Sequence, residues 1–159
     1  MKKGLTLIEV LVVVGILAIL FSLGTVIFGS FTRKDQALVE ARRIEAILNE
    51  AKIKTISGFS LGEGQNLNFG VYFQTDRYVL FPGLTYDPQD SRNQEFLLPV
   101  SLEIVPIFFP ENSVVFEKVT GEVLGFNPDQ NYLILDDKKS QEKKKISLNH
   151  LGRVKIEDL

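Results

Sequence analysis

The chain contains no cysteine and only one histidine, and its acidic residues slightly outnumber its basic ones. Because cysteine is absent, the sequence neither requires an oxidising compartment nor argues against one. The formal net charge of −2 means that no overall basic balance favours nucleic acid or anionic lipid as a partner. Internal repeats and low-complexity segments are also absent. With 159 residues, the chain has room for at most one compact domain and an appendage.

Charge is nearly missing from the N-terminal part of the chain. Overall, 45% of the residues are apolar and 24% are charged, which is ordinary for a globular protein. Between Gly4 and Thr32, however, Glu9 is the only charged residue. The uninterrupted stretch from Val10 to Phe31 is long enough to span a bilayer, which takes about 20 apolar residues. A carboxylate in such a segment costs about 2.5–3.5 kcal/mol in lipid, so Glu9 is expected to have a functional role.

The residues before Glu9 favour a cleavage between Gly4 and Leu5. A conventional signal peptide has an apolar core of roughly 7 to 15 residues and a small-residue cleavage site beyond it. This core offers no clear site of that kind, because apolar residues continue past its small residues. Cleavage after Gly4 would create an α-amino cation on Leu5, one helical turn from Glu9 or opposite the Glu9 of a staggered neighbour. An uncleaved signal-anchor helix is the alternative, and it leaves Glu9 unexplained.

The motif Lys3-Gly4-Leu5-Thr6-Leu7-Ile8-Glu9 resembles the class III leader of the type IV pilin family, which includes the type II secretion pseudopilins. The resemblance implies that a prepilin peptidase cuts between Gly4 and Leu5 and methylates the new amine of Leu5. It also implies that Glu9 acts in filament assembly. Leu5 departs from the phenylalanine that is usual in the family, but it is a tolerated apolar first residue.

The same resemblance implies a set of partners and a location. The partners are the prepilin peptidase, other pilin or pseudopilin subunits, the inner-membrane assembly platform and, before assembly, membrane lipid. The precursor would be a single-pass protein of the bacterial cytoplasmic membrane with its C-terminal domain outside the cytoplasm. It would then enter a periplasmic or surface filament. No cofactor, no metal and no enzymatic activity are expected.

A second helical pattern follows the apolar run without a break. Small and aliphatic residues recur at spacings of three and four, the period of one helix face, and charged residues decorate the opposite side. The recurring residues are Ala37, Ala41, Ile44, Leu48 and Ala51. We therefore expect one helix from about Leu5 to about Ile56. Residues 1–4 are then the leader, 5–31 the membrane-spanning and filament-core part, and 32–57 an amphipathic continuation.

Residues 58–159 are expected to form a β-rich globular domain. A glycine-rich stretch from Ser57 to Gly64 ends the helix, and the apolar period then changes to two. Strands are expected at residues 67–73, 78–81, 102–108, 114–118, 132–135, 145–148 and 153–156, with a loop at 82–94 and a hairpin at the end. The predicted fold is α+β and pilin-like: a long N-terminal helix, membrane-spanning in its first half, packed on an antiparallel β-sheet.

The strand pattern is similar to that of H-type minor pseudopilins and their minor-pilin relatives, over residues 70–83, 114–116, 132–135 and 146–156. The cysteine pair that closes a C-terminal loop in many major pilins is absent, which argues against a major pilin. The resemblance therefore implies a non-catalytic minor pseudopilin or minor pilin of a type II secretion or type IV pilus filament. The machine it serves and its position in the filament stay open.

One motif points instead to a hydrolase. The segment Gly58–Gly62, with Ser60 at its centre, matches the nucleophile-elbow pattern, and Asp136, Asp137 and His150 follow in hydrolase order. The elbow requires a strand before the serine and a helix after it, so that the hydroxyl is held on a strained turn. Here a predicted helix precedes the serine and a predicted strand follows it. The pattern is therefore not expected to mark an active site.

Two further clusters point to DNA and to calcium. The basic cluster Lys138–Lys145 makes a DNA-binding minor pilin of a DNA-uptake pilus the alternative function. Acidic residues dilute that cluster, however, and no aromatic residue interleaves with it in sequence to stack a base. Asp87, Asp90, Asn93 and Glu95 carry oxygen ligands of the kind that calcium takes, at a spacing unlike that of an EF-hand. Neither DNA nor a metal is the expected partner.

Processing of the leader is directly testable. When the chain is co-expressed with a prepilin peptidase, it should lose residues 1–4 and gain a methyl group on Leu5. Gly4→Glu should block the cleavage, because only a residue without a side chain lets the scissile bond approach a membrane protease closely. Intact-mass measurement of the parent protein and of the Gly4→Glu variant checks both expectations. A full-length precursor in the presence of active peptidase would contradict the prediction.

Overall fold

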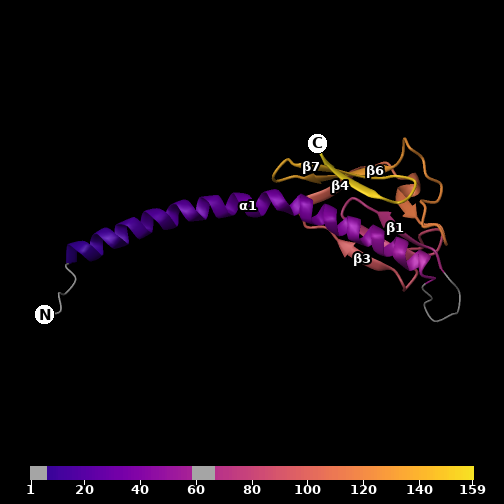
Figure 1. The fold of residues 1–159 in the computed structure, drawn as a ribbon, viewed down its shortest axis with the longest axis horizontal. Helices are drawn as coiled ribbons and strands as arrows, with labels where there is room; N and C mark the ends of the chain where they lie inside the picture. Colours follow the sequence, from indigo (N-terminus) through magenta and orange to yellow (C-terminus); the bar gives the residue numbers. More distant parts are fainter. Residues whose placement is uncertain (1–6, 59–66) are drawn as a thin grey trace. The chain divides into compact units, whose positions relative to one another are not determined.

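The computed structural model describes residues 7–58 and 67–159, without the side chains of residues 22–35. The chain divides into two compact units, residues 1–36 and 37–159. Helix α1 (Leu7–Ile56) contributes its N-terminal part to the first unit and its C-terminal part to the second (Figure 1). The predicted helix end at Ile56 is confirmed, whereas the predicted start at Leu5 lies outside the described residues.

The end of α1 follows the predicted glycine signal. The backbone N–H of Ser57 still donates to the carbonyl oxygen of Ile53 at 2.9 Å, and Gly58 then adopts a φ of 66°. This left-handed conformation is strained for residues with a Cβ but not for glycine, so it terminates the helix there. The rest of the predicted helix-ending stretch, residues 59–64, lies outside the described part of the chain.

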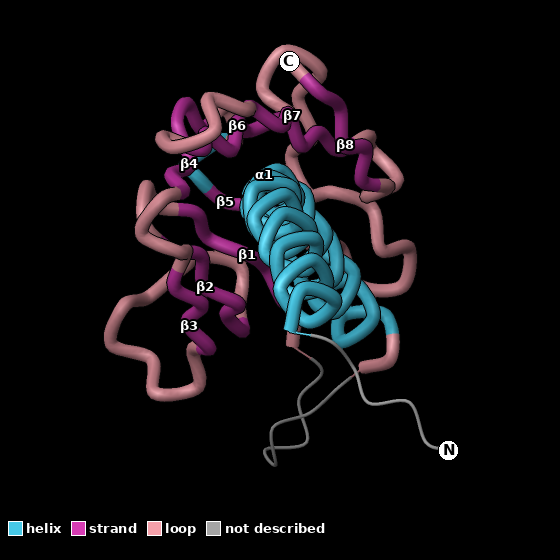
Figure 2. The backbone as a smooth tube through the Cα atoms, turned by 90° about the vertical axis from the view of Figure 1, so that its left-hand side faces the viewer, coloured by secondary structure: helices cyan, strands magenta, loops and turns pink. Residues whose placement is uncertain are grey.

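Antiparallel strands make up most of the rest of the second unit. The described strands are β1 (Phe69–Phe73), β2 (Arg77–Pro82), β3 (Gln94–Leu97), β4 (Leu102–Ile107), β5 (Ser113–Val115), β6 (Tyr132–Asp137), β7 (Lys143–Leu148) and β8 (Val154–Asp158). They form two sheets with the orders β3-β2-β1-β5 and β4-β6-β7-β8 (Figure 2). The α+β class is confirmed, but a single sheet was expected. The pairings of β5 with β1 and of β4 with β6 join distant segments, and local periodicity does not reveal them.

Strand prediction succeeded for every described strand except β3, which lies at the edge of a sheet. Each predicted strand overlaps an observed one, and the terminal hairpin is confirmed as β7–β8. The predicted loop at 82–94 ends in β3, which the sequence did not indicate. In β3 only Phe96 is partly buried, and the other residues are exposed. An edge strand of this kind lacks the apolar alternation by which strands are recognised.

The predicted apolar face of α1 lies at the centre of the core. Its five residues, Ala37, Ala41, Ile44, Leu48 and Ala51, are each 0% exposed. They belong to one cluster with residues of both sheets, such as Phe73 of β1 and Leu135 of β6. On the opposite side of the helix, Arg42 and Arg43 are exposed. The C-terminal part of α1 is therefore an amphipathic helix that covers apolar sheet surface, as the spacing predicted.

A buried polar contact joins α1 to β2. The hydroxyl of Tyr78 donates to Glu40 Oε1 at 2.9 Å, and both residues are buried. Burial and the neighbouring Glu40 carboxylate raise the pKa of Tyr78 above its usual value, so the phenol remains a donor. Tyr78 also stacks on Phe96 of β3, with ring centroids 5.3 Å apart. A buried carboxylate without a donor is costly, so this contact fixes α1 against β2.

Two more hydrogen bonds anchor the last turns of α1. The backbone N–H of Phe69, at the start of β1, donates to Thr55 Oγ1 at 2.9 Å. Lys52 Nζ donates to the carbonyl oxygen of Leu151 in the β7–β8 turn at 2.6 Å. Within the first sheet, β1 and β5 approach so closely at Gly70 that only glycine fits, because a Cβ there would lie 2.8 Å from the carbonyl oxygen of Val114. The helix end is therefore attached to both sheets.

Replacement of a core residue of α1 should be far more damaging than replacement of its neighbour. Leu48→Ala should lower the free energy of unfolding by about 2–5 kcal/mol, because it leaves a cavity among buried side chains. Asn49→Ala alters an exposed position and should change it by less than about 0.5 kcal/mol. Urea denaturation of residues 37–159, followed by circular dichroism, measures both. Equal effects would show that this helix face is not part of the core.

Candidate functional site

Glu9 lies in the first turn of α1 and is exposed. A carboxylate at this place interacts favourably with the partial positive charge of the helix N-terminus. Its sequence neighbours are apolar and exposed, with Ile8 71% and Val10 50% accessible. Gly4 and Leu5, the predicted cleavage and methylation residues, lie outside the described residues. The structure therefore places Glu9 on a helix but does not test its pairing with the amine of Leu5.

Apolar side chains surround and follow Glu9 on all sides of the helix. The exposed large apolar residues of this part are Leu7, Ile8, Val10, Leu11, Val12, Val13, Val14, Ile16, Leu17, Ile19, Leu20 and Phe21. Such a helix has no polar face to turn toward water. Contiguous apolar surface of this extent marks a contact with lipid or with other protein chains.

The N-terminal segment matches a known family model. Residues 1–25 match the family model of the prokaryotic N-terminal methylation motif. The chain carries a type IV pilin-like prepilin leader. The match includes Gly4, Leu5 and Glu9. No curated protein and no solved structure matches the chain.

A pilin-like leader has consequences for processing, partners and location. It implies processing by a prepilin peptidase, assembly with other pilin subunits, and membrane anchoring that precedes entry into a filament. In the described part of the chain, no helix has both the length and the hydropathy needed to cross a membrane. The membrane-spanning role of residues 5–31 and the likeness to H-type minor pseudopilins stay predictions.

The residues of the hydrolase pattern have structural roles where the structure describes them. Ser60 lies outside the described residues. Asp136 forms an ion pair with a lysine of β7. Asp137 is buried, which raises a carboxyl pKa, but hydrogen bonds that include the backbone N–H of Lys139 hold the pKa of Asp137 below its usual value. His150 is exposed in the β7–β8 turn. The pilin-like leader indicates a structural subunit instead.

The basic cluster lies along the β6–β7 hairpin, where most of its lysines pair with acids. The ion pairs are Lys138–Glu103 at 2.5 Å, Lys143–Asp136 at 2.7 Å, and Lys144–Asp158. No aromatic residue interleaves with these lysines in sequence, but one lies beside them in space. Lys145 Nζ lies 4.3 Å from the centroid of the Tyr132 ring, which stacks on Phe108 at 4.6 Å. Pairing of β6 with β7 creates this contact, so sequence order alone did not show it.

Three of the four oxygen-bearing residues of the candidate calcium loop are engaged in other contacts, whereas the buried Oδ1 of the fourth, Asn93, has no hydrogen-bond partner within the described residues. Asp90 pairs with Arg92 at 2.7 Å, and hydrogen bonds from the side chain and backbone of Arg92 lower the pKa of Asp90 to about 2. Asp87 accepts a bond from a backbone N–H two residues on, at 2.9 Å. Glu95 lies in β3 and pairs with Arg77. Throughout residues 7–58 and 67–159, no group of three or more acidic, histidine or cysteine side chains is arranged to hold a metal.

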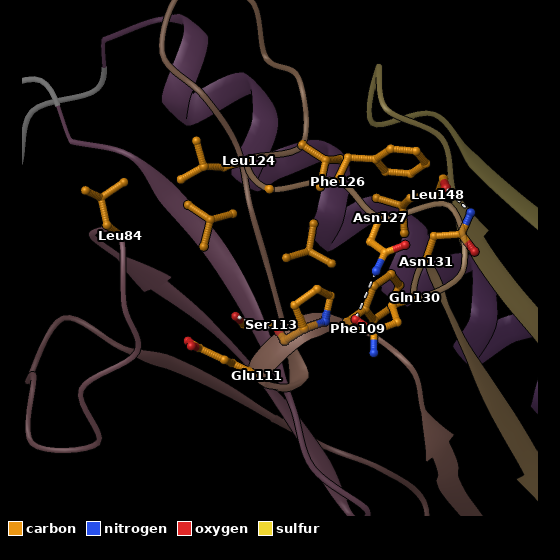
Figure 3. A pocket seen from close by; sticks show the side chains of 15 residues that line it. Leu84, Phe109, Glu111, Ser113, Leu124, Phe126, Asn127, Gln130, Asn131 and Leu148 are labelled. Carbon is orange, nitrogen blue, oxygen red and sulfur yellow. Dashed lines mark hydrogen bonds between the residues drawn. The ribbon is translucent and has the colours of Figure 1, made fainter.

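The second unit has a surface pocket that the sequence did not predict (Figure 3). Its volume is about 200 Å³, and it lies beside β5, the short helix η1 (Pro110–Asn112) and the segment 123–131. Its apolar walls include Leu84, Phe109, Val115, Val123, Leu124 and Phe126. Two of its polar residues are already engaged, since Asn127 Nδ2 donates to Gln130 Oε1 at 3.2 Å. The walls come from separate segments that share no motif, which is why sequence analysis missed them.

Proposed function

We propose that this protein is a non-catalytic structural subunit of a type II secretion or type IV pilus filament, of the minor pseudopilin or minor pilin class. A prepilin peptidase cuts the precursor between Gly4 and Leu5 and methylates the amine of Leu5. The apolar part of α1 holds the subunit in the cytoplasmic membrane and later passes into the filament core. The second unit stays outside the cytoplasm.

The observation that carries this proposal is the methylation motif at residues 1–25, joined to a helix whose apolar residues are exposed on all sides. Two environments can cover such a helix. Lipid covers it before assembly, since its backbone groups are satisfied within the helix and its side chains are apolar. The helices of neighbouring subunits cover it afterwards, which keeps the apolar surface out of water.

Glu9 has a different role in each environment. In lipid its carboxylate is costly, and in the filament it neutralises the methylated amine of Leu5 on a neighbouring subunit. An opposite charge within a few ångströms offsets the penalty that an apolar environment places on each ion alone. Glu9 therefore favours the assembled state over the membrane-resident one.

Glu9→Val should separate processing from assembly. The variant should insert into the membrane and be cleaved after Gly4 as efficiently as the parent chain. It should enter filaments poorly, because the amine of Leu5 is left unpaired in an apolar core. Glu50→Val is a control at a partly exposed ion pair of α1, where little is lost.

Cross-linking to a co-expressed major subunit measures incorporation. A loss with Glu9→Val but not with Glu50→Val is the expected result. A mild loss would indicate a position at the filament tip, where no subunit lies ahead. Unchanged cross-linking of both Glu9→Val and Glu9→Lys would exclude a pairing role for Glu9.

The contact of Lys145 with Tyr132 favours one second function, the DNA-binding minor pilin of a DNA-uptake pilus. A groove that binds a single strand combines cations that contact the phosphates with aromatic rings whose faces stack on bases. Lys145 and Phe108 both lie against the Tyr132 ring, so a base can stack on it only if one of them moves away. The surrounding ion pairs oppose it, because they leave little net positive charge.

Fluorescence anisotropy with a single-stranded oligonucleotide at low salt distinguishes the two functions. If DNA binds, Tyr132→Ala should weaken it, whereas Tyr86→Ala, which removes a tyrosine stacked on Tyr72 instead, should not. For a purely structural subunit, we expect no binding to either variant or to the parent chain.

A further inference from the structure

The pocket beside β5 has the features of a site for an apolar side chain next to a cation. Leu84 and Leu124, both lining it, are 61% and 48% exposed, so its mouth is apolar as well as its walls. Figure 3 shows the side chain of Glu111 on the same side of the pocket as Leu84. No ion pair involves Glu111 within the described residues. The described lining also includes the polar residues Ser113, Asn127, Gln130 and Asn131, and Glu111 is the one charged residue among them.

The rim of the pocket is conformationally strained. Glu111 and Asn112 have φ values of 52° and 55°, in the left-handed region that residues with a Cβ seldom adopt. The turn they form is closed by the backbone N–H of Ser113, which donates to the carbonyl oxygen of Pro110. Strained residues of this kind cluster at functional sites, where the surrounding structure holds them in place.

A second strained turn of the same unit presents an apolar tip. Val119 has a φ of 74°, which is a marked outlier for a β-branched residue, and it is 87% exposed. The backbone N–H of Thr120 donates to the carbonyl oxygen of Lys118 at 2.9 Å, so the turn is tight. The turn ends at Gly121, which packs closely against the end of α1: a Cβ at this position would lie only 2.4 Å from Ile56 Cδ1. Burial within the unit does not explain why a valine occupies this position.

The tip and the pocket are complementary in size and charge. The pocket volume of about 200 Å³ is several times the roughly 30 Å³ that one water occupies in the liquid, so it has room for an isopropyl group. Lys118 is exposed, is adjacent to the tip, and has no ion pair among the described residues. It supplies the cation that would lie opposite Glu111, while the adjacent carboxylate of Glu117 accepts a hydrogen bond from the Thr120 hydroxyl at 3.1 Å.

We propose that the Lys118–Val119 turn of one copy of this chain binds in the pocket of a second copy, with Val119 between Leu84 and Leu124 and Lys118 beside Glu111. The contact joins two different surfaces, so each copy keeps one free turn and one free pocket. Contacts of this type form open helical arrays unless the rotation closes a ring. The inference rests on the proposed function, since an open array of subunits is what a filament requires. The contact between turn and pocket can form in a short run of adjacent copies as well as in a long one.

Cross-linking between single cysteines tests the contact without interference, because the chain has no cysteine of its own. Two full-length copies with different affinity tags are mixed in detergent and treated with a short bismaleimide. One copy carries Val119→Cys and the other Leu124→Cys. This pair should cross-link, whereas Val100→Cys, which is 100% exposed at another loop, should not cross-link to Leu124→Cys. Equal yields from the two pairs would overturn the proposal.

Charge reversal tests the orientation of the contact. Lys118→Glu on the copy that supplies the turn, or Glu111→Lys on the copy that supplies the pocket, should lower the cross-linking rate about tenfold. The two reversals together should restore it. A double variant that remains as weak as the single ones would overturn the pairing of Lys118 with Glu111.

Val119→Gly separates binding from folding. Glycine relieves the backbone strain at a position where little side-chain burial is lost, so the melting temperature should stay the same or rise. With the turn copy labelled at Lys118→Cys instead, the added Val119→Gly should reduce its cross-linking to Leu124→Cys. Unchanged cross-linking would show that the valine side chain does not enter the pocket.

Leader processing in the same preparations distinguishes this inference from the proposed function. Cleaved, methylated protein that fails to cross-link refutes the contact and leaves the filament subunit in place. Cross-linked protein whose leader is not cleaved by an active peptidase supports the contact and contradicts the filament subunit.

Discussion

Both sheets of the second unit pack against one stripe of α1, and the rest of that unit depends on this contact. The stripe combines three alanines with Ile44 and Leu48, all without exposed surface. Small side chains let strands approach a helix closely, and the two larger ones belong to the same buried cluster as residues of both sheets. The hydrogen bonds from Tyr78 to Glu40 and from Phe69 to Thr55 form only when the stripe faces the sheets. Burial of the stripe therefore sets the orientation that the polar contacts then fix.

The same helix has two different surfaces along its length. From Ala37 onward, apolar residues are confined to one face, which is the pattern of a helix that covers a sheet. From Leu7 to Phe21, they occupy every face, and Glu9 is the only charged residue there. A globular unit of this size has no core that could bury the second kind of surface. Its cover must come from lipid or from other chains, which is why the N-terminal part is assigned to anchoring and assembly.

Sequence alone identified the features that local pattern encodes. The period of three and four in α1, the strands β1 and β6, and the helix-ending Gly58 were each predictable, because each follows from neighbouring residues. The edge strand β3 was missed because only Phe96 is partly buried in it. The contact of Lys145 with Tyr132 and the pocket beside β5 depend on which strands pair, and no local signal carries that information. The N-terminal motif, in contrast, is recognised from the sequence alone, because Gly4 and Leu5 lie outside the described residues.

The most direct measurement of the central claim is the amount of this protein in filaments sheared from cells with and without an active prepilin peptidase. The expected result is that the sheared, pelleted filaments contain the protein only when the peptidase is active, and that its sequence there starts at a methylated Leu5. Recovery of the protein in the membrane fraction alone, in the presence of both the peptidase and intact filaments, would contradict its role as a filament subunit.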